Sequence, residues 1–358
     1  MRILYTLGLI VIAAHGLAAQ PARAGSEVIL RNFRFADGES LSELRIHYIA
    51  LGRPRRDASG TVRNGVLILH GTTGSGSGFL SRSFAGELFG PGQLLDTSRY
   101  YVILPDGIGH GGSSKPSDGL HAHFPRYTYD DMVDAQHRLL VEGLRVNHLH
   151  LVMGTSMGCM HAWVWGERYP DFVDGLVPLA CAPTQIAGRN RMMRKMIIDA
   201  IRADPDWHGG DYASPPERGL RTALAMLFTM TSSPLQQQKS APTRDGADAF
   251  ITKYVDDRLR TMDANDMLYA FDASRDYDPS PNLESIRASV LAINSADDVV
   301  NPPELGLMEK LMPRVKHGRY VLIPTSDRTR GHGTHSLPAV WGKYLEEFLA
   351  QLTPTTSQ

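Results

Sequence analysis

Ser156 lies between two glycines in the stretch LVMGTSMGCM (151–160), a spacing that suits nucleophilic chemistry. The apolar residues before it predict the end of a buried strand, and residues 157–169 predict a helix. A sharp turn between them leaves no room for side chains at Gly154 and Gly158, because a Cβ there would collide with the neighbouring backbone. Such a strained turn is typical of a serine whose hydroxyl is presented at a sheet edge as a nucleophile.

A nucleophilic serine needs a base, and the base needs an acid that orients it. Two later strand ends supply these groups in the order nucleophile, acid, histidine. NSADDVVNPPE carries Asp297 and Asp298, and TSDRTRGHGTHSLP carries His332 and His335. The spacing to a following proline favours Asp298, and the position at a glycine-flanked loop tip favours His332. Asp297 as a residue that hydrogen-bonds the loop, and His335 as the start of the last helix, remain the alternatives.

Acyl chemistry also needs two backbone N–H groups that point at the developing oxyanion. The sequence predicts one at Met157, directly after the serine at a helix N-terminus, where the helix dipole favours an anion. The second is predicted at Thr72 in the loop LHGTTGSGSG, after the third strand. This glycine-rich loop lacks the lysine of a phosphate-binding P-loop, so a nucleotide site is disfavoured. DGIGHGGSSKP, with Asp106 and His110, is interpreted as a structural loop near the site.

The elements that would position these residues alternate between strands and helices. Strands are predicted over 28–35, 43–50, 65–71, 100–107, 148–154, 175–180, 289–295 and 320–326, and helices over 130–144, 157–169 and 339–352. The later strands are continuously apolar, as in a parallel sheet that is covered on both faces. The alternation predicts an α/β fold, with a mostly parallel central sheet, helices on both faces and ligands at the carboxyl ends of the strands.

One interval, about 184–280, contains no convincing strand and reads as a helical lid inserted over the strand ends. The chain has 358 residues, of which 42% are hydrophobic and 21% charged, with a formal net charge of −1. This composition predicts one large globular domain over 25–358 and gives no reason to expect a nucleic-acid partner. The oligomeric state is not determined by the sequence, and a homodimer stays open.

The N-terminal segment resembles a secretory signal peptide over 1–24. Arg2 precedes an apolar run, and small residues offer cleavage after Ala24 or Ala19. The run is short for a membrane span, so we expect a mature protein that is exported to the periplasm or secreted, without a stable span.

The only two cysteines, Cys159 and Cys181, fall in segments predicted to be buried. Export permits a disulfide, but two buried inert thiols are the favoured interpretation. His121 and His123 form a lone HxH in a polar loop, which is weak support for a metal. No metal or cofactor is predicted.

From about Val66 to the end, the chain resembles the α/β-hydrolase superfamily, and specifically its homoserine O-acetyltransferase branch. The segments that carry the resemblance are FPRYTYDDMVDAQHRLL, GTSMGCMHAWVWGERYPD, DPDWHGGDYASPPERGL and MDANDMLYAFDASRDYD. The resemblance implies that Ser156, Asp298 and His332 form a catalytic triad beneath the helical lid.

The chain departs from that branch where the branch binds its amino-acid substrate. Leu224 and Met230 occupy the places of an arginine and a tyrosine, and Gly333 follows His332 where the branch has an aspartate. GIGHGGSSKP also replaces a GSTGP-type stretch. The loss of three polar contacts to homoserine is therefore predicted, with Arg221 as a substitute on the wrong helical face.

These observations predict an exported serine hydrolase that cleaves a carboxylic ester through an acyl-enzyme, with an amide or a lactone as the less favoured substrate. Export would separate the enzyme from acyl-CoA, which favours water as the acyl acceptor. Apolar lid residues, among them Met226, Leu227 and Phe228, suggest a partly apolar substrate. The alternative is an acyltransferase of the homoserine O-acetyltransferase type, and a non-catalytic binding protein is disfavoured by the intact serine turn.

Overall fold

A single eight-stranded sheet runs through the computed structural model, which describes residues 25–352. Its strands are β1 (Ser26–Arg34), β2 (Ser40–Leu51), β3 (Gly65–Leu69), β4 (Tyr101–Pro105), β5 (Leu149–Thr155), β6 (Val173–Leu179), β7 (Ser289–Ser295) and β8 (Gly318–Ile323). The order in space is β1-β2-β4-β3-β5-β6-β7-β8. Strand β2 pairs antiparallel with both β1 and β4, and all other neighbouring strands pair parallel. The predicted α/β class and mostly parallel sheet are confirmed.

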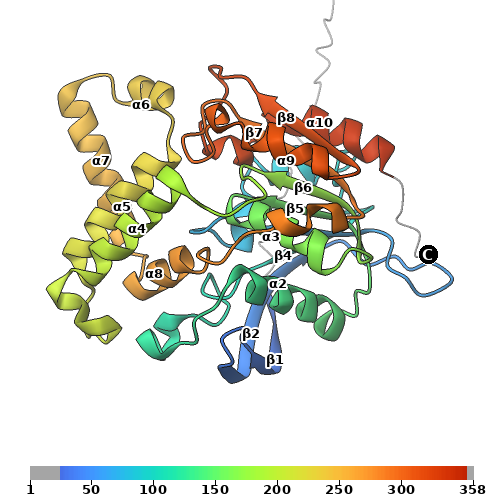
Figure 1. Cartoon of the computed structure of the whole chain (residues 1–358), viewed down its shortest axis with the longest axis horizontal. Helices are drawn as coiled ribbons and strands as arrows, with labels where there is room; N and C mark the ends of the chain where they lie inside the picture. The colour runs from blue at the N-terminus through green and yellow to red at the C-terminus, as the bar shows by residue number, and fades with distance from the viewer. Residues whose placement is uncertain (1–24, 353–358) are drawn as a thin grey trace, which may run out of the picture.

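Helices cover both faces of this sheet (Figure 1). The covering helices are α1 (Ala85–Leu88), α2 (Tyr129–Arg138), α3 (Met157–Arg168), α9 (Leu307–Leu311) and α10 (Pro338–Gln351). A π-helical turn, Leu139–Gly143, extends α2 to nearly the predicted helix end. Short 3-10 turns lie at Gly76–Leu80, Pro116–Asp118, His121–His123, Pro205–Gly210, Ser280–Ser285, Pro303–Leu305, Met312–Arg314 and Gly333–Ser336.

Successive side chains of the parallel strands point to opposite faces of the sheet and pack into two hydrophobic cores, one on each face. In β3, Leu67 and Leu69 join a core that includes Trp163 of α3. Val66 and Ile68 point the other way and join a core that includes Trp341 of α10. Both faces are therefore buried, which explains why these strands are continuously apolar rather than alternating.

The interval between β6 and β7 is helical, as the sequence predicts, and lies at one end of the molecule (Figure 1). It contains α4 (Gly188–Arg202), α5 (Glu217–Thr231), α6 (Pro234–Ser240), α7 (Arg244–Leu259) and α8 (Ala264–Asp272). We call residues 184–280 the helical insertion. Residues of α4, α5, α7 and α8, with Val300 after β7, pack into a third hydrophobic cluster, which includes Ile197, Leu224 and Phe271.

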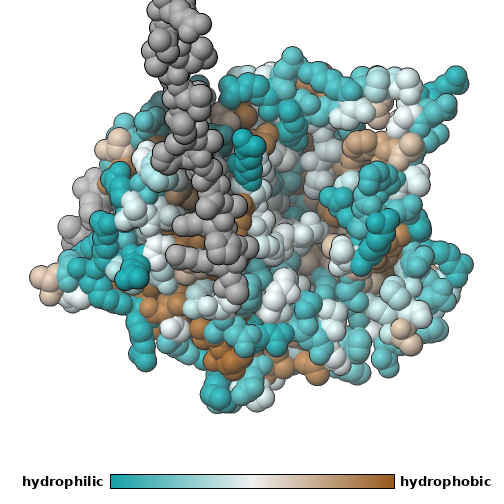
Figure 2. All heavy atoms as spheres, turned by 180° about the vertical axis from the view of Figure 1, so that it is seen from behind, coloured by the Kyte–Doolittle hydropathy of each residue, from teal (hydrophilic) through white to brown (hydrophobic). Residues whose placement is uncertain are grey.

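Seen from behind, the surface is mostly hydrophilic, with hydrophobic residues in small groups (Figure 2). Within 25–352, no helix is both long and apolar enough to cross a membrane. The predicted signal peptide at 1–24 lies outside the described residues.

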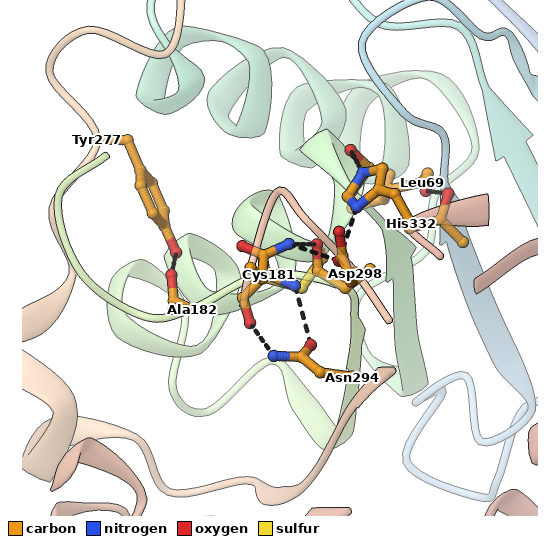
Figure 3. Close-up of a disulfide and its surroundings, with 12 residues drawn as sticks. Leu69, Cys181, Ala182, Tyr277, Asn294, Asp298 and His332 are labelled. Carbon is orange, nitrogen blue, oxygen red and sulfur yellow. Dashed lines mark hydrogen bonds and ion pairs between the residues drawn. A yellow bond between two sulfur atoms is a disulfide. The ribbon is translucent and has the colours of Figure 1, made fainter. Parts of the chain in front are cut away.

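Cys159 and Cys181 form a disulfide, so the favoured interpretation of two free thiols was wrong. Cys159 lies in the first turn of α3, and Cys181 follows β6, the strand next to β5 in the sheet. Because the chain turns sharply at Ser156, the start of α3 lies beside the end of β6. The Cα atoms of Cys159 and Cys181 are therefore 5.9 Å apart. Cys181 also exchanges backbone hydrogen bonds with the Asn294 side chain of β7 (Figure 3). Predicted burial could not distinguish two free thiols from a disulfide, because cysteines of either kind can be buried.

Candidate active site

Ser156 sits at the turn between β5 and α3 with φ 55° and ψ −109°, a left-handed conformation that is strained for a residue with a side chain. The flanking glycines make the turn possible. A Cβ at Gly154 would overlap the carbonyl of Gly158, and one at Gly158 would overlap the carbonyl of Leu69. The predicted turn is therefore present, and it raises the serine hydroxyl above the carboxyl ends of the strands.

A hydrogen-bonded chain joins Ser156 to the ends of two later strands. The Oγ of Ser156 lies 2.7 Å from Nε2 of His332, and Nδ1 of His332 lies 2.8 Å from Oδ2 of Asp298. Figure 3 shows the His332–Asp298 pair beside the disulfide. With a proton on Nδ1, the ring donates to the carboxylate, and Nε2 is free to accept the serine proton. The structure thus brings together the three side chains that the sequence selected.

Asp298 is held as a carboxylate although it is only 1% exposed. Burial by itself would raise its pKa, but the adjacent His332 ring, Asn301 Nδ2 and the Val300 N–H keep that pKa below its ordinary value. The two protein donors besides the histidine lie at 3.0 and 2.8 Å from its oxygens. A negative charge therefore stands behind His332 and would stabilise a protonated ring.

The two alternative residues occupy different places. Asp297 accepts hydrogen bonds from Thr329 Oγ1, the Gly331 N–H and Ser295 Oγ, at 2.9, 2.9 and 2.5 Å, and so braces the loop that carries His332. His335 packs edge-on against His332, with ring centroids 5.2 Å apart, and its Nδ1 pairs with Ser336 Oγ. Desolvation lowers the pKa of His335 to about 3, so its ring is neutral. Neither residue hydrogen-bonds to Ser156.

The loop after β3 passes directly over the serine. A Cβ at Gly71 would lie 3.3 Å from Cβ of Ser156 and 3.8 Å from its Oγ. Within the described chain, the amides of Thr72 and Met157 have no backbone or side-chain acceptor. Both predicted oxyanion donors are thus free to bind an oxygen, and Thr72 lines the cavity described below.

Two buried histidines that the sequence did not single out as a pair hold this loop. His70 accepts a hydrogen bond at Nε2 from the Gly107 N–H at 2.9 Å, so its Nδ1–H donates to the Gly71 carbonyl at 2.8 Å. Burial, with the nearby His110, lowers the pKa of His70 to about 4, which keeps this neutral tautomer. His110 Nε2 lies 2.6 Å from the Thr72 carbonyl.

Asp106 completes this support from the loop after β4. Its Oδ1 accepts from the Gly76 N–H at 2.7 Å, and its Oδ2 contacts the Gly112 N–H and His47 Nδ1, both at 2.8 Å. The loop DGIGHGGSSKP is therefore a support for the loop over Ser156. A histidine after each of two neighbouring strands was the available signal, but only the sheet order places them together.

A cavity of about 350 Å³ opens at Ser156 between the sheet and the helical insertion. The sheet side contributes His70, Thr72, Ser156, His332 and His335. The helical insertion contributes Arg194, Leu227, Met230, Thr231, Tyr254, Arg258 and Phe271. Of the three apolar residues predicted to face the substrate, Leu227 lines the cavity. The helical insertion thus forms the far wall of the cavity.

The residues that depart from the acetyltransferase branch are also placed. Leu224 is fully buried inside the cluster of the helical insertion, whereas Met230 and Gly333 line the cavity. Arg221 pairs with Asp256 at 2.8 Å on the exposed side of α5 and does not line the cavity. It therefore does not replace the lost arginine.

Comparison with known proteins places this geometry in a family. The model of the alpha/beta hydrolase fold family matches residues 64–328. The chain belongs to the α/β-hydrolase superfamily. Within it, a probable acyltransferase of Methanothermobacter thermautotrophicus is 31% identical over 80% of this chain and 87% of its own length. The homoserine O-acetyltransferase of Haloferax prahovense is 32% identical over 78% of this chain and 76% of its own length.

Among solved structures of the superfamily, an esterase superposes with a TM-score of 0.78 at 22% identity, over 91% of this chain and 99% of that chain. At this identity the likeness shows the α/β-hydrolase fold. The resemblance to the homoserine O-acetyltransferase branch is confirmed by the curated relatives, and the chain is an enzyme of a superfamily that contains both esterases and acyltransferases.

Proposed function

We propose that the protein transfers acyl groups through a covalent acyl-enzyme on Ser156. The observation that carries this proposal is the continuous chain from Ser156 Oγ through His332 to Asp298, at the edge of a cavity. In the first step, Nε2 of His332 takes the hydroxyl proton while Oγ attacks the ester carbonyl. The carbonyl oxygen becomes an oxyanion, which the amides of Thr72 and Met157 would bind. The carbonyl then re-forms, and His332 protonates the leaving alcohol.

In the second step, an acceptor O–H gives its proton to His332 as its oxygen attacks the acyl-enzyme. An alcohol as acceptor would make the protein an acyltransferase. The curated relatives support this candidate, because both are acyltransferases by name and cover most of the chain. The leaving alcohol and the accepting alcohol would use the same subsite, since the second step reverses the first.

Water as acceptor would make the protein a carboxylic ester hydrolase, and a specific observation supports this second candidate. No aspartate or glutamate lines the described cavity, so nothing acidic is present there to pair with the ammonium group of an amino-acid acceptor. Homoserine itself is therefore a poor fit, and a hydroxyl without an ammonium group, or water, fits better.

We also propose that the mature protein is exported. The N-terminal charge and apolar run support this, and so does the disulfide between Cys159 and Cys181, since disulfides persist in oxidising compartments. Cell fractionation, with the N-terminal sequence of the recovered protein, would test it. Uncleaved protein found only in the cytosol would contradict it.

Product analysis by mass spectrometry tests the acyl-transfer proposal. Purified protein receives p-nitrophenyl acetate alone, with homoserine, or with simple alcohols, beside Ser156→Ala. We expect acyl-enzyme in the wild type and none in the variant. Acetylated alcohol as the main product would identify a transferase, and free acetate in every reaction a hydrolase. Turnover that Ser156→Ala retains would overturn the mechanism.

A further inference from the structure

Arg194 of α4 lines the cavity at Ser156, although it is only 1% exposed. Its Nε donates to Asn190 Oδ1 at 2.9 Å, and its Nη1 donates to Ser274 Oγ at 3.1 Å. The guanidinium also lies 5.7 Å from the ring centroid of Phe271. All of these partners are neutral. Because a buried charge is costly unless it is paired, a guanidinium held this way is poised for an anion.

No carboxylate of the described chain forms an ion pair with Arg194. Its Nη2 has no hydrogen-bond partner in residues 25–352. This nitrogen is not among the unpaired side-chain atoms that are fully buried, so part of it is open to the cavity. This nitrogen is therefore free to donate into the cavity. The side chain itself is fixed by two hydrogen bonds and an aromatic ring, so little conformational entropy would be lost on binding.

The other charges around the cavity have the same sign. Arg258 of α7 lies with its guanidinium 3.6 Å from the ring centroid of Tyr254 and, within the described part of the chain, forms no ion pair. Asp298 is shielded behind His332, and no other acidic side chain faces the cavity. By contrast, Arg221 and Asp256 neutralise one another outside it. The cavity is therefore positive and lacks an acidic group for a cation.

We propose that Arg194 binds a carboxylate of the substrate, and that the natural substrate is an ester whose acyl or alcohol half bears a carboxylate and no ammonium group. This inference rests on the proposed acyl-transfer function of the same site. A cavity of about 350 Å³ suits a small ester of this kind. Arg194 would act as a specificity-determining residue, since it selects the substrate without taking part in proton transfer.

Three nitrophenyl esters test the proposal. Two are acetates, p-nitrophenyl acetate and 5-acetoxy-2-nitrobenzoate, and the other is p-nitrophenyl hemisuccinate. In the order p-nitrophenyl acetate, p-nitrophenyl hemisuccinate and 5-acetoxy-2-nitrobenzoate, they differ in whether and where they carry a carboxylate. The first is neutral, the second carries a carboxylate on the acyl half, and the third carries one on the leaving group. We expect the wild type to prefer one of the two anionic esters by about 10- to 100-fold in kcat/KM, as a charge-assisted hydrogen bond allows. The anionic ester that the wild type prefers shows whether the acyl half or the alcohol half of the natural substrate carries the carboxylate.

Arg194→Gln should abolish that preference, because it removes the charge that pairs with the carboxylate, and Arg194→Lys should retain part of it. Arg221→Gln is the matched control, because it removes an arginine of the helical insertion that lies outside the cavity. Circular dichroism checks folding, and the preference of the wild type alone tests the proposal if a variant fails to fold.

Equal kcat/KM values for all three esters in the wild type, or an equal loss for all three in Arg194→Gln, would overturn the inference. These outcomes differ from failure of the proposed function. In that case, no ester would give acyl-enzyme in the wild type, or Ser156→Ala would turn over as fast as the wild type.

Discussion

At the scale of single residues, the site divides into groups that touch the reacting atoms and groups that hold them. In the proposed mechanism, Ser156 and His332 belong to the first kind, together with the amides of Thr72 and Met157. Asp297 belongs to the second, because it binds the loop of His332 rather than its ring. Two adjacent aspartates can thus have distinct roles, which depend on the direction in which each side chain leaves the end of β7.

His332→Ala should lower kcat/KM for an ester by about 10⁴- to 10⁶-fold, because Ser156 would lose its base. His335→Ala should cost less than about tenfold, since its ring packs against His332 and does not hydrogen-bond to Ser156. Steady-state kinetics of both variants side by side make the comparison, with Ser156→Ala as the reference for full loss. Equal losses in the two histidine variants would contradict the assignment of His332 as the base.

Glu167 of α3 offers a test of buried charge away from the site. Burial, with Asp130 and Asp278 nearby, raises the pKa of its carboxyl to about 8 from an ordinary 4.5, and its Oε1 has no partner in the described chain. Between these pH values the folded state keeps a proton that the unfolded state has lost. The free energy of unfolding should therefore fall as the pH rises from about 4.5 to 8.

Glu167→Gln removes this dependence. We expect it to raise Tm by about 2–4 °C at pH 8.5 and to leave Tm unchanged near pH 4.5. Differential scanning calorimetry at both pH values checks it, with the exposed Glu346→Gln as control. A gain of the same size at the two pH values would show that the carboxyl does not titrate as described.

At the scale of elements, the turn from β5 to α3 leaves no room for a side chain at its two glycines. Gly158→Ala would place a methyl group against the Leu69 carbonyl of β3, which is backbone and cannot swing aside. We expect a loss of about 3 kcal/mol or more in the free energy of unfolding, measured by urea denaturation. Gly78→Ala is a useful control, because Gly78, like Gly158, has no positive φ but has open space around it. An equal loss in both would show that the collision with Leu69 is not the cause.

The strands and the nucleophile turn were predictable because they depend on local patterns: continuous apolar runs, and glycines two residues either side of Ser156. The disulfide and the pairing of His70 with His110 were not. Both depend on which strands are neighbours, and the order β4-β3-β5-β6 brings together residues whose separation in the sequence carries no such signal. Arg194 was missed for a similar reason, since only packing shows that its partners are neutral.

At the scale of the whole molecule, one covalent link ties the start of α3 to the end of β6. Cys159→Ala combined with Cys181→Ala should lower the free energy of unfolding by about 2–4 kcal/mol, because the unfolded chain would gain freedom. Urea denaturation of the oxidised wild type and the double variant measures this, and alkylation of the unfolded wild type counts its free thiols. Identical denaturation curves, or two free thiols, would contradict it.

The third hydrophobic cluster separates the part of the chain that forms the far wall of the cavity from the part that carries Ser156. The wall that carries Arg194 and Tyr254 belongs to helices that pack into this cluster, while Ser156 and its partners stand on the sheet. We expect changes in α4, α5 or α7 that spare the contacts of Val300 and Ser233 to reshape what the cavity admits and to leave the Ser156–His332–Asp298 chain in place. For protein engineers, the helical insertion is therefore the part of the chain in which to vary the choice of substrate while the proposed acyl-transfer centre is kept.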